Sequence, residues 1–304
     1  MQKPDFFVVG APKCGTTSLD HYLNQHPEVF MARPKEPHFF GTDFFRPVYV
    51  RNRDEYLSLF SSVGSERRIG ETSVWYLYSK KAAVEIRDFC PNAQIIIMLR
   101  DPVEMIYSLH SQRTANGNEK ILDFEAALQA ERDRKQQLAT YRGDYPLELL
   151  LYREVGMYTE QVKRYVDIFG WQSIHIIIYD DFKSRTMQVY KAVCAFLGVS
   201  TDFEPDFVVY NKNKRVRNQY LANFMNNPPG IFQKAVRTLL FDDLRFALRK
   251  RIAQANMSYA PRQPMNPALE QELRAFFAPE IYRLSKLVNR DLTYWSKAQA
   301  RGTG

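Results

Sequence analysis

Short apolar runs, rich in β-branched and aromatic residues, recur along the chain. Three of them are almost unbroken by polar side chains, which is typical of parallel strands that are covered on both faces. We therefore predict strands at Phe6–Val9, Gln94–Leu99 and Ser173–Tyr179. Two weaker strand candidates are Val29–Met31 and Arg68–Glu71.

Segments with helical periodicity lie between these runs. Gly170 and Gly198 follow two of the segments as stop signals. Strands that alternate with helices are typical of a parallel α/β sheet. The predicted helices are Ser18–Gln25, Ser79–Phe89, Val103–Ser111, Asp123–Gln137, Glu154–Phe169 and Thr186–Leu197.

After residue 210 the pattern becomes mostly helical. It ends with a periodic stretch at Asn266–Asn289, in which Pro279 is expected to start a second helix. We therefore predict one α/β domain over residues 1–304. It would consist of a P-loop-like parallel sheet flanked by helices, with a helical C-terminal portion.

The composition is that of an ordinary globular protein. Hydrophobic residues make up 45% of the 304 positions and charged residues 25%, and no stretch reaches the roughly 18–20 apolar residues needed to span a bilayer. The first apolar run is too short for the core of a signal peptide, so a cytoplasmic location is expected. Cys14, Cys90 and Cys194 are widely separated, which predicts free thiols rather than a disulfide or a zinc site.

Positive charge is concentrated in one part of the chain. The formal net charge is +8, and residues 210–262 contain eleven Lys and Arg against Asp242 and Asp243. The remainder is close to neutral, which disfavours a nucleic-acid-binding coat and favours one basic segment that faces an anion. Within it, residues 231–253 have the pattern of an amphipathic basic helix. This helix could be core-packed, a lid, or a surface that contacts a membrane.

The strongest local motif, residues 10–18 (GAPKCGTTS), follows the first apolar run. A glycine-bounded turn from a strand into a helix exposes backbone N–H groups next to the positive end of the helix dipole, which suits a phosphate group. A Walker A loop has lysine directly after its second glycine. Here Thr16 stands at that place and Lys13 lies inside the turn. The position of Lys13 counts against an ATP-hydrolysing enzyme.

Four motifs, in order, resemble the sulfotransferases that use 3′-phosphoadenosine 5′-phosphosulfate (PAPS), especially the heparan-sulfate-type branch and its bacterial relatives. Residues 12–19 are similar to their 5′-phosphosulfate loop, and residues 35–40 (KEPHFF) to the segment with their catalytic base. The resemblance implies that Glu36 deprotonates the acceptor and that Lys13 stabilises charge on the leaving oxygen. His38, two residues after Glu36 in a strand-like segment, would face the same way and orient the acceptor or Glu36. The residues implied in donor binding by the loop are Lys13, Cys14, Gly15, Thr16, Thr17 and Ser18.

The third and fourth motifs concern the other phosphate of the nucleotide. The Arg-Asp-Pro motif that begins at Arg100, with Ser108 one helical stretch later, resembles the family's 3′-phosphate site. Arg100 would offer a two-pronged donor and Ser108 a hydroxyl, while Asp101 is expected to cap the helix. A later basic run resembles the segment that closes over the nucleotide, with either Arg215 or Arg217 near the 3′-phosphate.

Together the motifs imply in-line transfer of a sulfuryl group from PAPS to a hydroxyl group, or as the lesser alternative an amine, of a glycan, glycolipid or small molecule. Adenosine 3′,5′-bisphosphate (PAP) would be the other product, and neither a metal ion nor a nucleic acid is expected to take part. Glu71 is a departure, because it stands where heparan 3-O-sulfotransferases carry a lysine; heparan itself is therefore a less favoured acceptor. Two alternatives stay open: a P-loop kinase or NTPase, and a non-catalytic relative that binds nucleotides or polyanions.

Overall fold

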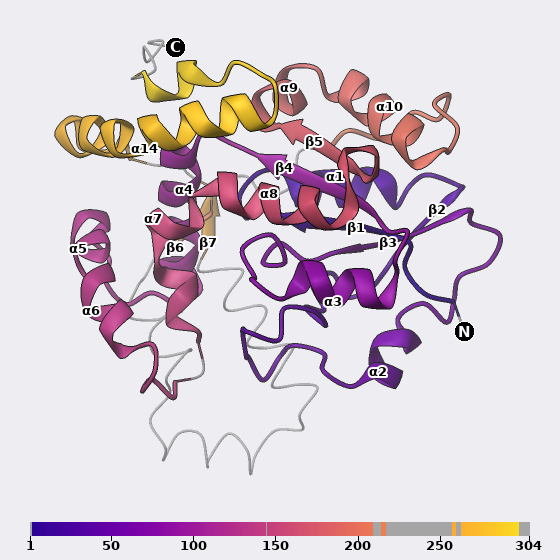
Figure 1. Cartoon of the computed structure of the whole chain (residues 1–304), viewed down its shortest axis with the longest axis horizontal. Helices are drawn as coiled ribbons and strands as arrows, with labels where there is room; N and C mark the ends of the chain where they lie inside the picture. Colours follow the sequence, from indigo (N-terminus) through magenta and orange to yellow (C-terminus); the bar gives the residue numbers. More distant parts are fainter. Residues whose placement is uncertain (1, 144, 209–213, 217–256, 260–262, 298–304) are drawn as a thin grey trace.

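The computed structural model describes residues 2–143, 145–208, 214–216, 257–259 and 263–297. Its main sheet is parallel, with the strand order β2-β3-β1-β4-β5 (Figure 1). The strands of this sheet are β1 (Phe6–Gly10), β2 (Val29–Met31), β3 (Arg68–Thr72), β4 (Gln94–Leu99) and β5 (Ile174–Ile178). All five strand predictions are confirmed to within one residue at each end. A separate antiparallel pair is formed by β6 (Lys214–Val216) and β7 (Met257–Tyr259).

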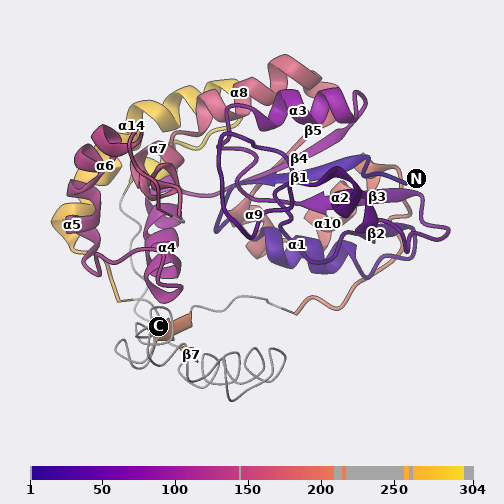
Figure 2. The same ribbon diagram turned by 90° about the horizontal axis from the view of Figure 1, so that it is seen from below.

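Helices cover both faces of the main sheet. Figure 2 shows α3 and α8 on one face and α1 and α10 on the other. The α-helices are α1 (Thr16–Leu23), α2 (Arg53–Ser58), α3 (Ala82–Phe89), α4 (Pro102–Ala115), α5 (Phe124–Gln129), α6 (Glu131–Gln137), α7 (Tyr152–Val155), α8 (Tyr158–Phe169), α9 (Tyr179–Ser184), α10 (Thr186–Leu197) and α14 (Pro267–Leu287). Short 3₁₀ helices are η1 (Leu147–Leu150), η2 (Trp171–Ser173) and η3 (Thr293–Ser296). Because both faces are covered, β1 is buried along its whole length and β4 in all but its first residue.

Three helix predictions are wrong in detail. The helix predicted over Asp123–Gln137 is divided into α5 and α6 at Ala130. The helix predicted over Glu154–Phe169 is divided into α7 and α8 at Gly156 and Met157. Pro279 does not start a new helix but lies inside α14. Proline removes one backbone hydrogen bond from a helix, yet Phe277 and Ile281 on either side of it are buried. Packing of α14 against α8 and α4 therefore holds the helix together through the proline.

Several other expectations can be compared with the described residues. All three cysteines are buried free thiols, as predicted. No described helix combines the length and the apolar composition needed to cross a membrane. The candidate amphipathic helix at 231–253 lies outside the described residues, and the single-domain interpretation stays a prediction.

The fold brings the motif segments to one edge of the sheet. In a parallel sheet the carboxyl ends of all strands lie at the same edge, where ligands of such folds bind. β1 lies between β3 and β4, so the turn after β1 is flanked by the ends of both neighbours. The segment after β2 runs past the end of β3, because Glu36 N–H donates to the Thr72 carbonyl at 3.1 Å. Helix α4 starts where β4 ends and extends away from the sheet (Figures 1 and 2).

Gly70 is required by close packing in the sheet. It lies in register between Phe6 of β1 and Met31 of β2. A Cβ atom at this position would be 2.2 Å from Phe6 Cζ and 2.6 Å from Met31 Sδ, both in buried side chains.

We therefore predict that Gly70→Ala lowers the free energy of unfolding by about 1–3 kcal/mol, measured by urea denaturation. The exposed Gly64 is a matched control, because its Cβ would meet only Glu66 Oε2 at 3.4 Å. Gly64→Ala should change the same free energy by no more than about 0.5 kcal/mol. Equal stability of the two variants would contradict the packing described for β3.

Candidate active site

A cavity of about 820 Å³ opens at the carboxyl edge of the sheet. This volume is within the range of small-molecule binding sites. The predicted site residues that line it are Lys13, Gly15, Thr16, Thr17, Ser18, Glu36, His38, Arg100 and Ser108. The structure thus brings three separate motifs of the sequence to one cavity.

The turn after β1 is shaped for an oxyanion. Gly15 caps α1 with φ of 92°, a left-handed conformation that side chains disfavour. A Cβ atom there would also be 3.1 Å from the Phe182 ring. The first backbone N–H groups of a helix have no partner within the helix and can bind an anion. Thr16 and Ser18 line the cavity in this first turn.

Cys14 does not present its side chain to the cavity. Its Sγ is fully buried and donates a hydrogen bond to the Pro12 carbonyl at 3.4 Å. Burial raises the pKa of this thiol to about 12, so it carries no negative charge at neutral pH. The predicted contribution of Cys14 to donor binding is therefore confined to its backbone.

Glu36 and His38 form a hydrogen-bonded pair at the cavity. His38 Nε2 is 3.2 Å from one carboxylate oxygen of Glu36, and Lys35 Nζ is 2.9 Å from the other. The segment is not strand-like as predicted, because Glu36 and His38 have left-handed φ angles of 63° and 51°. Such angles are uncommon outside glycine and gather at functional sites. With these angles, the side chains on either side of Pro37 both line the same cavity.

The charges of this pair follow from burial and from their neighbours. Burial alone would raise the pKa of Glu36, but the Lys35 ammonium and the hydrogen bond from His38 hold it well below its usual value. Burial lowers the pKa of His38 below its usual value against the opposing pull of Glu36. At neutral pH the pair is therefore an ionised carboxylate and a neutral imidazole, and Nε2–H donates to Glu36.

A buried carboxyl group supports this segment from the sheet. Glu71 is fully buried and accepts hydrogen bonds from Ser73 Oγ at 2.6 Å, Tyr56 Oη at 2.8 Å and Tyr76 Oη at 3.1 Å. Ser73 Oγ in turn accepts from the backbone N–H of His38 at 3.0 Å. Desolvation raises the pKa of Glu71 to about 7. Glu71 therefore acts as a buried anchor and does not face the cavity.

Arg51 holds the same segment from its other side. Its guanidinium donates to the carbonyls of His38 at 2.9 Å and Phe39 at 2.7 Å, and also to those of Phe40, Gly41 and Phe44. Neither Arg51 nor the Glu71 network was predicted from the sequence. The motif indicates the candidate base but not the distant side chains that fix its backbone.

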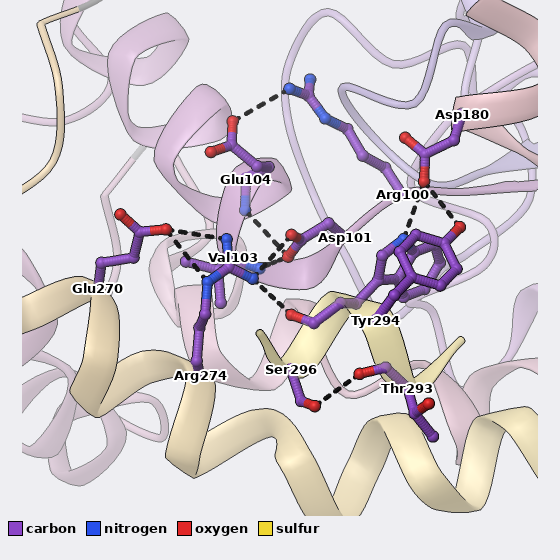
Figure 3. Close-up of polar contacts among 11 residues, drawn as sticks. Arg100, Asp101, Val103, Glu104, Asp180, Glu270, Arg274, Thr293, Tyr294 and Ser296 are labelled. Carbon is purple, nitrogen blue, oxygen red and sulfur yellow. Dashed lines mark hydrogen bonds and ion pairs between the residues drawn. The ribbon is translucent and has the colours of Figure 1, made fainter. Parts of the chain in front are cut away.

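The Arg-Asp-Pro motif contains one residue that lines the cavity and one with a structural role. Asp101 accepts from the N–H groups of Val103 and Glu104, as expected of a cap, and pairs with Arg274 of α14 at 2.9 Å (Figure 3). Arg100 lines the cavity, with its guanidinium carbon 4.8 Å from the centroid of the Tyr179 ring. The Asp101–Arg274 pair thus fixes the start of α4 and leaves Arg100 at the cavity.

Further contacts in Figure 3 join the C-terminal segment to the sheet. Asp180, which follows β5, accepts from Tyr294 Oη and from Trp295 Nε1, each at 2.9 Å. Arg274 also binds Glu270 and the Trp295 carbonyl. These contacts tie the C-terminal segment to the residues after β5 and to the start of α4.

The last predicted motif is only partly within the described residues. Arg215 belongs to β6, whose backbone lies beside α4, the helix that carries Ser108. Arg217 lies outside the described residues, so the choice between Arg215 and Arg217 stays open. Across the described ranges, no group of three or more His, Cys, Asp or Glu side chains is arranged to hold a metal ion. That the reaction needs no metal stays a prediction.

Comparison with known proteins identifies the family. Residues 3–245 match the family described as "Sulfotransferase domain". The chain belongs to this sulfotransferase family. A solved sulfotransferase from Alicyclobacillus acidocaldarius has a similar structure, with a TM-score of 0.73 and 34% sequence identity. That similarity covers 98% of this chain and 100% of the bacterial one.

More distant similarity links the sulfotransferase chain to larger animal proteins. Human carbohydrate sulfotransferase 15 is 29% identical over a match that covers 64% of this chain and 44% of the human protein. Mouse bifunctional heparan sulfate N-deacetylase/N-sulfotransferase 3 is 27% identical over 66% of this chain and 23% of that protein. The match thus spans less than half the length of each of these relatives.

The coupling between Glu36 and His38 can be tested by titration. The Glu36 carboxylate raises the pKa of His38, so we predict that Glu36→Gln lowers that pKa further. NMR titration of the imidazole protons measures it, with the spectrum of His38→Ala to assign the signal. Glu28→Gln removes a carboxylate near His26 instead and should leave the titration of His38 unchanged. A His38 pKa that rises or stays constant in Glu36→Gln is incompatible with the pair described above.

Proposed function

We propose that this sulfotransferase transfers a sulfuryl group from PAPS to a hydroxyl group of a glycan. The observation that carries the proposal is the convergence of Lys13 and the ionised, hydrogen-bonded Glu36 on one cavity. A phosphate loop alone would suit many nucleotide-binding proteins. A carboxylate and a lysine at one cavity suit a transfer reaction. The carboxylate accepts the proton of the acceptor, and the lysine stabilises the negative charge that develops on the leaving group.

The cavity residues that we assign to the nucleotide fit the two phosphate groups of PAPS. The N–H groups at the start of α1 and the Lys13 ammonium are suited to the 5′-phosphosulfate. Arg100 and Ser108 are suited to the 3′-phosphate, because a guanidinium binds two phosphate oxygens at once. PAPS supplies the activated sulfuryl group, and the remaining chemistry is that of these side chains.

Each bond change in the transfer has a residue to assist it. Glu36 accepts the proton of the acceptor hydroxyl as the new O–S bond forms. The S–O bond to the 5′-phosphate breaks on the opposite side of sulfur, and Lys13 stabilises the electron pair left on that bridging oxygen of PAP. The low pKa of Glu36 makes it a weak base. A weak base is sufficient for a hydroxyl that becomes acidic only as its oxygen bonds to sulfur.

The acceptor is proposed by analogy with the relatives, whose names refer to carbohydrate and heparan sulfate. A hydroxyl is preferred over an amine, and glycolipids and small molecules are the other acceptor classes. The cytoplasmic location and a peripheral membrane contact stay predictions. A P-loop kinase is disfavoured, because Lys13 lies inside the turn and Thr16 at the position of the Walker lysine. A non-catalytic relative is disfavoured by the intact pair of Glu36 and His38.

The proposal is tested by an acceptor screen with PAPS, in which mass spectrometry detects the addition of one sulfate to a glycan. With an acceptor found in this way, Lys13→Ala and Glu36→Gln should each lower kcat by about 10²–10⁴-fold. Lys80→Ala and Glu125→Gln are matched controls at exposed positions outside the cavity and should retain the rate of the unmodified protein. A rate close to that of the controls in either site variant would falsify the role given to that residue.

A further inference from the structure

Trp295 in the C-terminal segment connects two stretches of chain that adjoin Arg100. Its side chain is fully buried. The indole Nε1–H donates to Asp180 Oδ2 at 2.9 Å, and the Trp295 carbonyl accepts from the Arg274 guanidinium. Asp180 directly follows a ring that contacts Arg100, and Arg274 binds Asp101, the residue after Arg100. Both contacts of Trp295 therefore lead to an arginine that lines the cavity.

The first contact anchors the aromatic ring beside Arg100. Asp180 is the second residue of α9, and its Oδ2 also accepts from Tyr294 Oη at 2.9 Å (Figure 3). Tyr179 begins the same helix, and the centroid of its ring is 4.8 Å from the guanidinium carbon of Arg100. The face of an aromatic ring at this distance attracts a guanidinium group and limits its orientation. Trp295 and Tyr294 thus hold the ring that faces Arg100.

The second contact anchors the backbone that follows Arg100. Arg274 donates to Asp101 Oδ2 at 2.9 Å, and Oδ1 of the same carboxylate accepts from the Val103 N–H at 2.9 Å (Figure 3). Arg274 and Asp101 are only 2–3% exposed. Breaking such a buried pair leaves an uncompensated charge and is strongly destabilising. The Trp295 carbonyl, as a further acceptor for Arg274, helps to orient this pair.

The direct polar contacts of Arg100 are long by comparison. Its guanidinium donates to the Lys13 carbonyl at 3.4 Å and to a carboxylate oxygen of Glu104 at 3.3 Å. Both distances exceed the usual range for a hydrogen bond from nitrogen. An arginine loses side-chain entropy when a phosphate fixes it, and it loses less when its surroundings have already limited its orientation. The anchored ring and the anchored backbone therefore favour the binding of a phosphate by Arg100.

We propose that Trp295 is a positioning residue for donor recognition, which holds Arg100 in the orientation that distinguishes a 3′-phosphorylated nucleotide from one without that phosphate. The inference rests on the proposed function, because it names a residue that sets the nucleotide specificity of the same site. Trp295 does not touch the nucleotide in this proposal. It acts through Asp180 and the Tyr179 ring on one side of Arg100, and through Arg274 on the other.

Calorimetry with two nucleotides measures this role. PAP carries the 3′-phosphate and adenosine 5′-monophosphate (5′-AMP) lacks it, so the ratio of their dissociation constants reports recognition of that group. Trp295→Phe removes the indole N–H and keeps an aromatic ring at the buried position. We expect it to weaken the binding of PAP about 3- to 10-fold and that of 5′-AMP by less than about 2-fold. A merely structural role would weaken both nucleotides alike.

A second background shows whether the effect passes through Arg100. We expect Arg100→Ala to weaken the binding of PAP, and addition of Trp295→Phe to cause no further loss. Trp171 is exposed and lies outside the cavity, so Trp171→Phe is the matched control and should bind both nucleotides as the unmodified protein does. If Trp295→Phe fails to fold, Asp180→Ala replaces it, because this change removes the acceptor of the same contact at a half-buried position.

The outcomes separate this inference from the proposed function. Three results overturn the inference: an equal loss of affinity for PAP and 5′-AMP, an unchanged affinity for both, or a loss for PAP that is as large with Arg100→Ala as without it. Each of them leaves the proposed sulfuryl transfer intact as long as the unmodified protein prefers PAP. An unmodified protein that binds PAP no more tightly than 5′-AMP overturns the donor in the proposed function, and the inference with it.

Discussion

The buried carboxyl group of Glu71 is the point where the sheet and the proposed catalytic base are joined. Ser73 donates to Glu71 and accepts from the His38 N–H, while Tyr76 donates to Glu71 and accepts from the Phe40 N–H. Two backbone groups of the base segment are therefore tied to one carboxyl at the end of β3. Left-handed backbone angles persist only when the surroundings over-determine them, and this network supplies that constraint for His38. The position of Glu36 follows from it.

The remaining parts of the cavity depend on the same edge of the sheet. The turn with Lys13 leaves β1, and the Lys13 carbonyl accepts from Arg100, which follows the neighbouring β4. Helix α4 begins just after Arg100 and carries Ser108, so the residues proposed for the 3′-phosphate depend on where this helix starts. The ion pair between Asp101 and Arg274 fixes that start. The residues proposed for the nucleotide and the proposed base are thus positioned by elements that share one buried framework.

Local patterns were sufficient to predict the strands of the main sheet and the residues that carry the motifs, because both depend on short stretches of sequence. Continuous apolar runs located β1, β4 and β5, weaker signals located β2 and β3, and glycine spacing located the turn with Lys13. The β6–β7 pair was not predicted; the sequence after residue 210 was interpreted as mostly helical. Contacts between distant segments could not be predicted from the sequence: Arg51 and Ser73 both bind the backbone of His38, yet neither belongs to a motif. Burial in the folded chain also overrode local signals, as when packing of α14 kept it helical through Pro279.

A crystal structure of the protein in complex with PAP tests the proposed site most directly. We expect the 5′-phosphate to lie at the N–H groups that begin α1, within hydrogen-bond distance of Lys13, and the 3′-phosphate to contact Arg100 and Ser108. Glu36 should then face the 5′-phosphate across the space that the sulfuryl group would occupy. Binding of PAP in the reverse orientation, or at a place remote from Lys13 and Glu36, would show that these residues do not form the site of sulfuryl transfer.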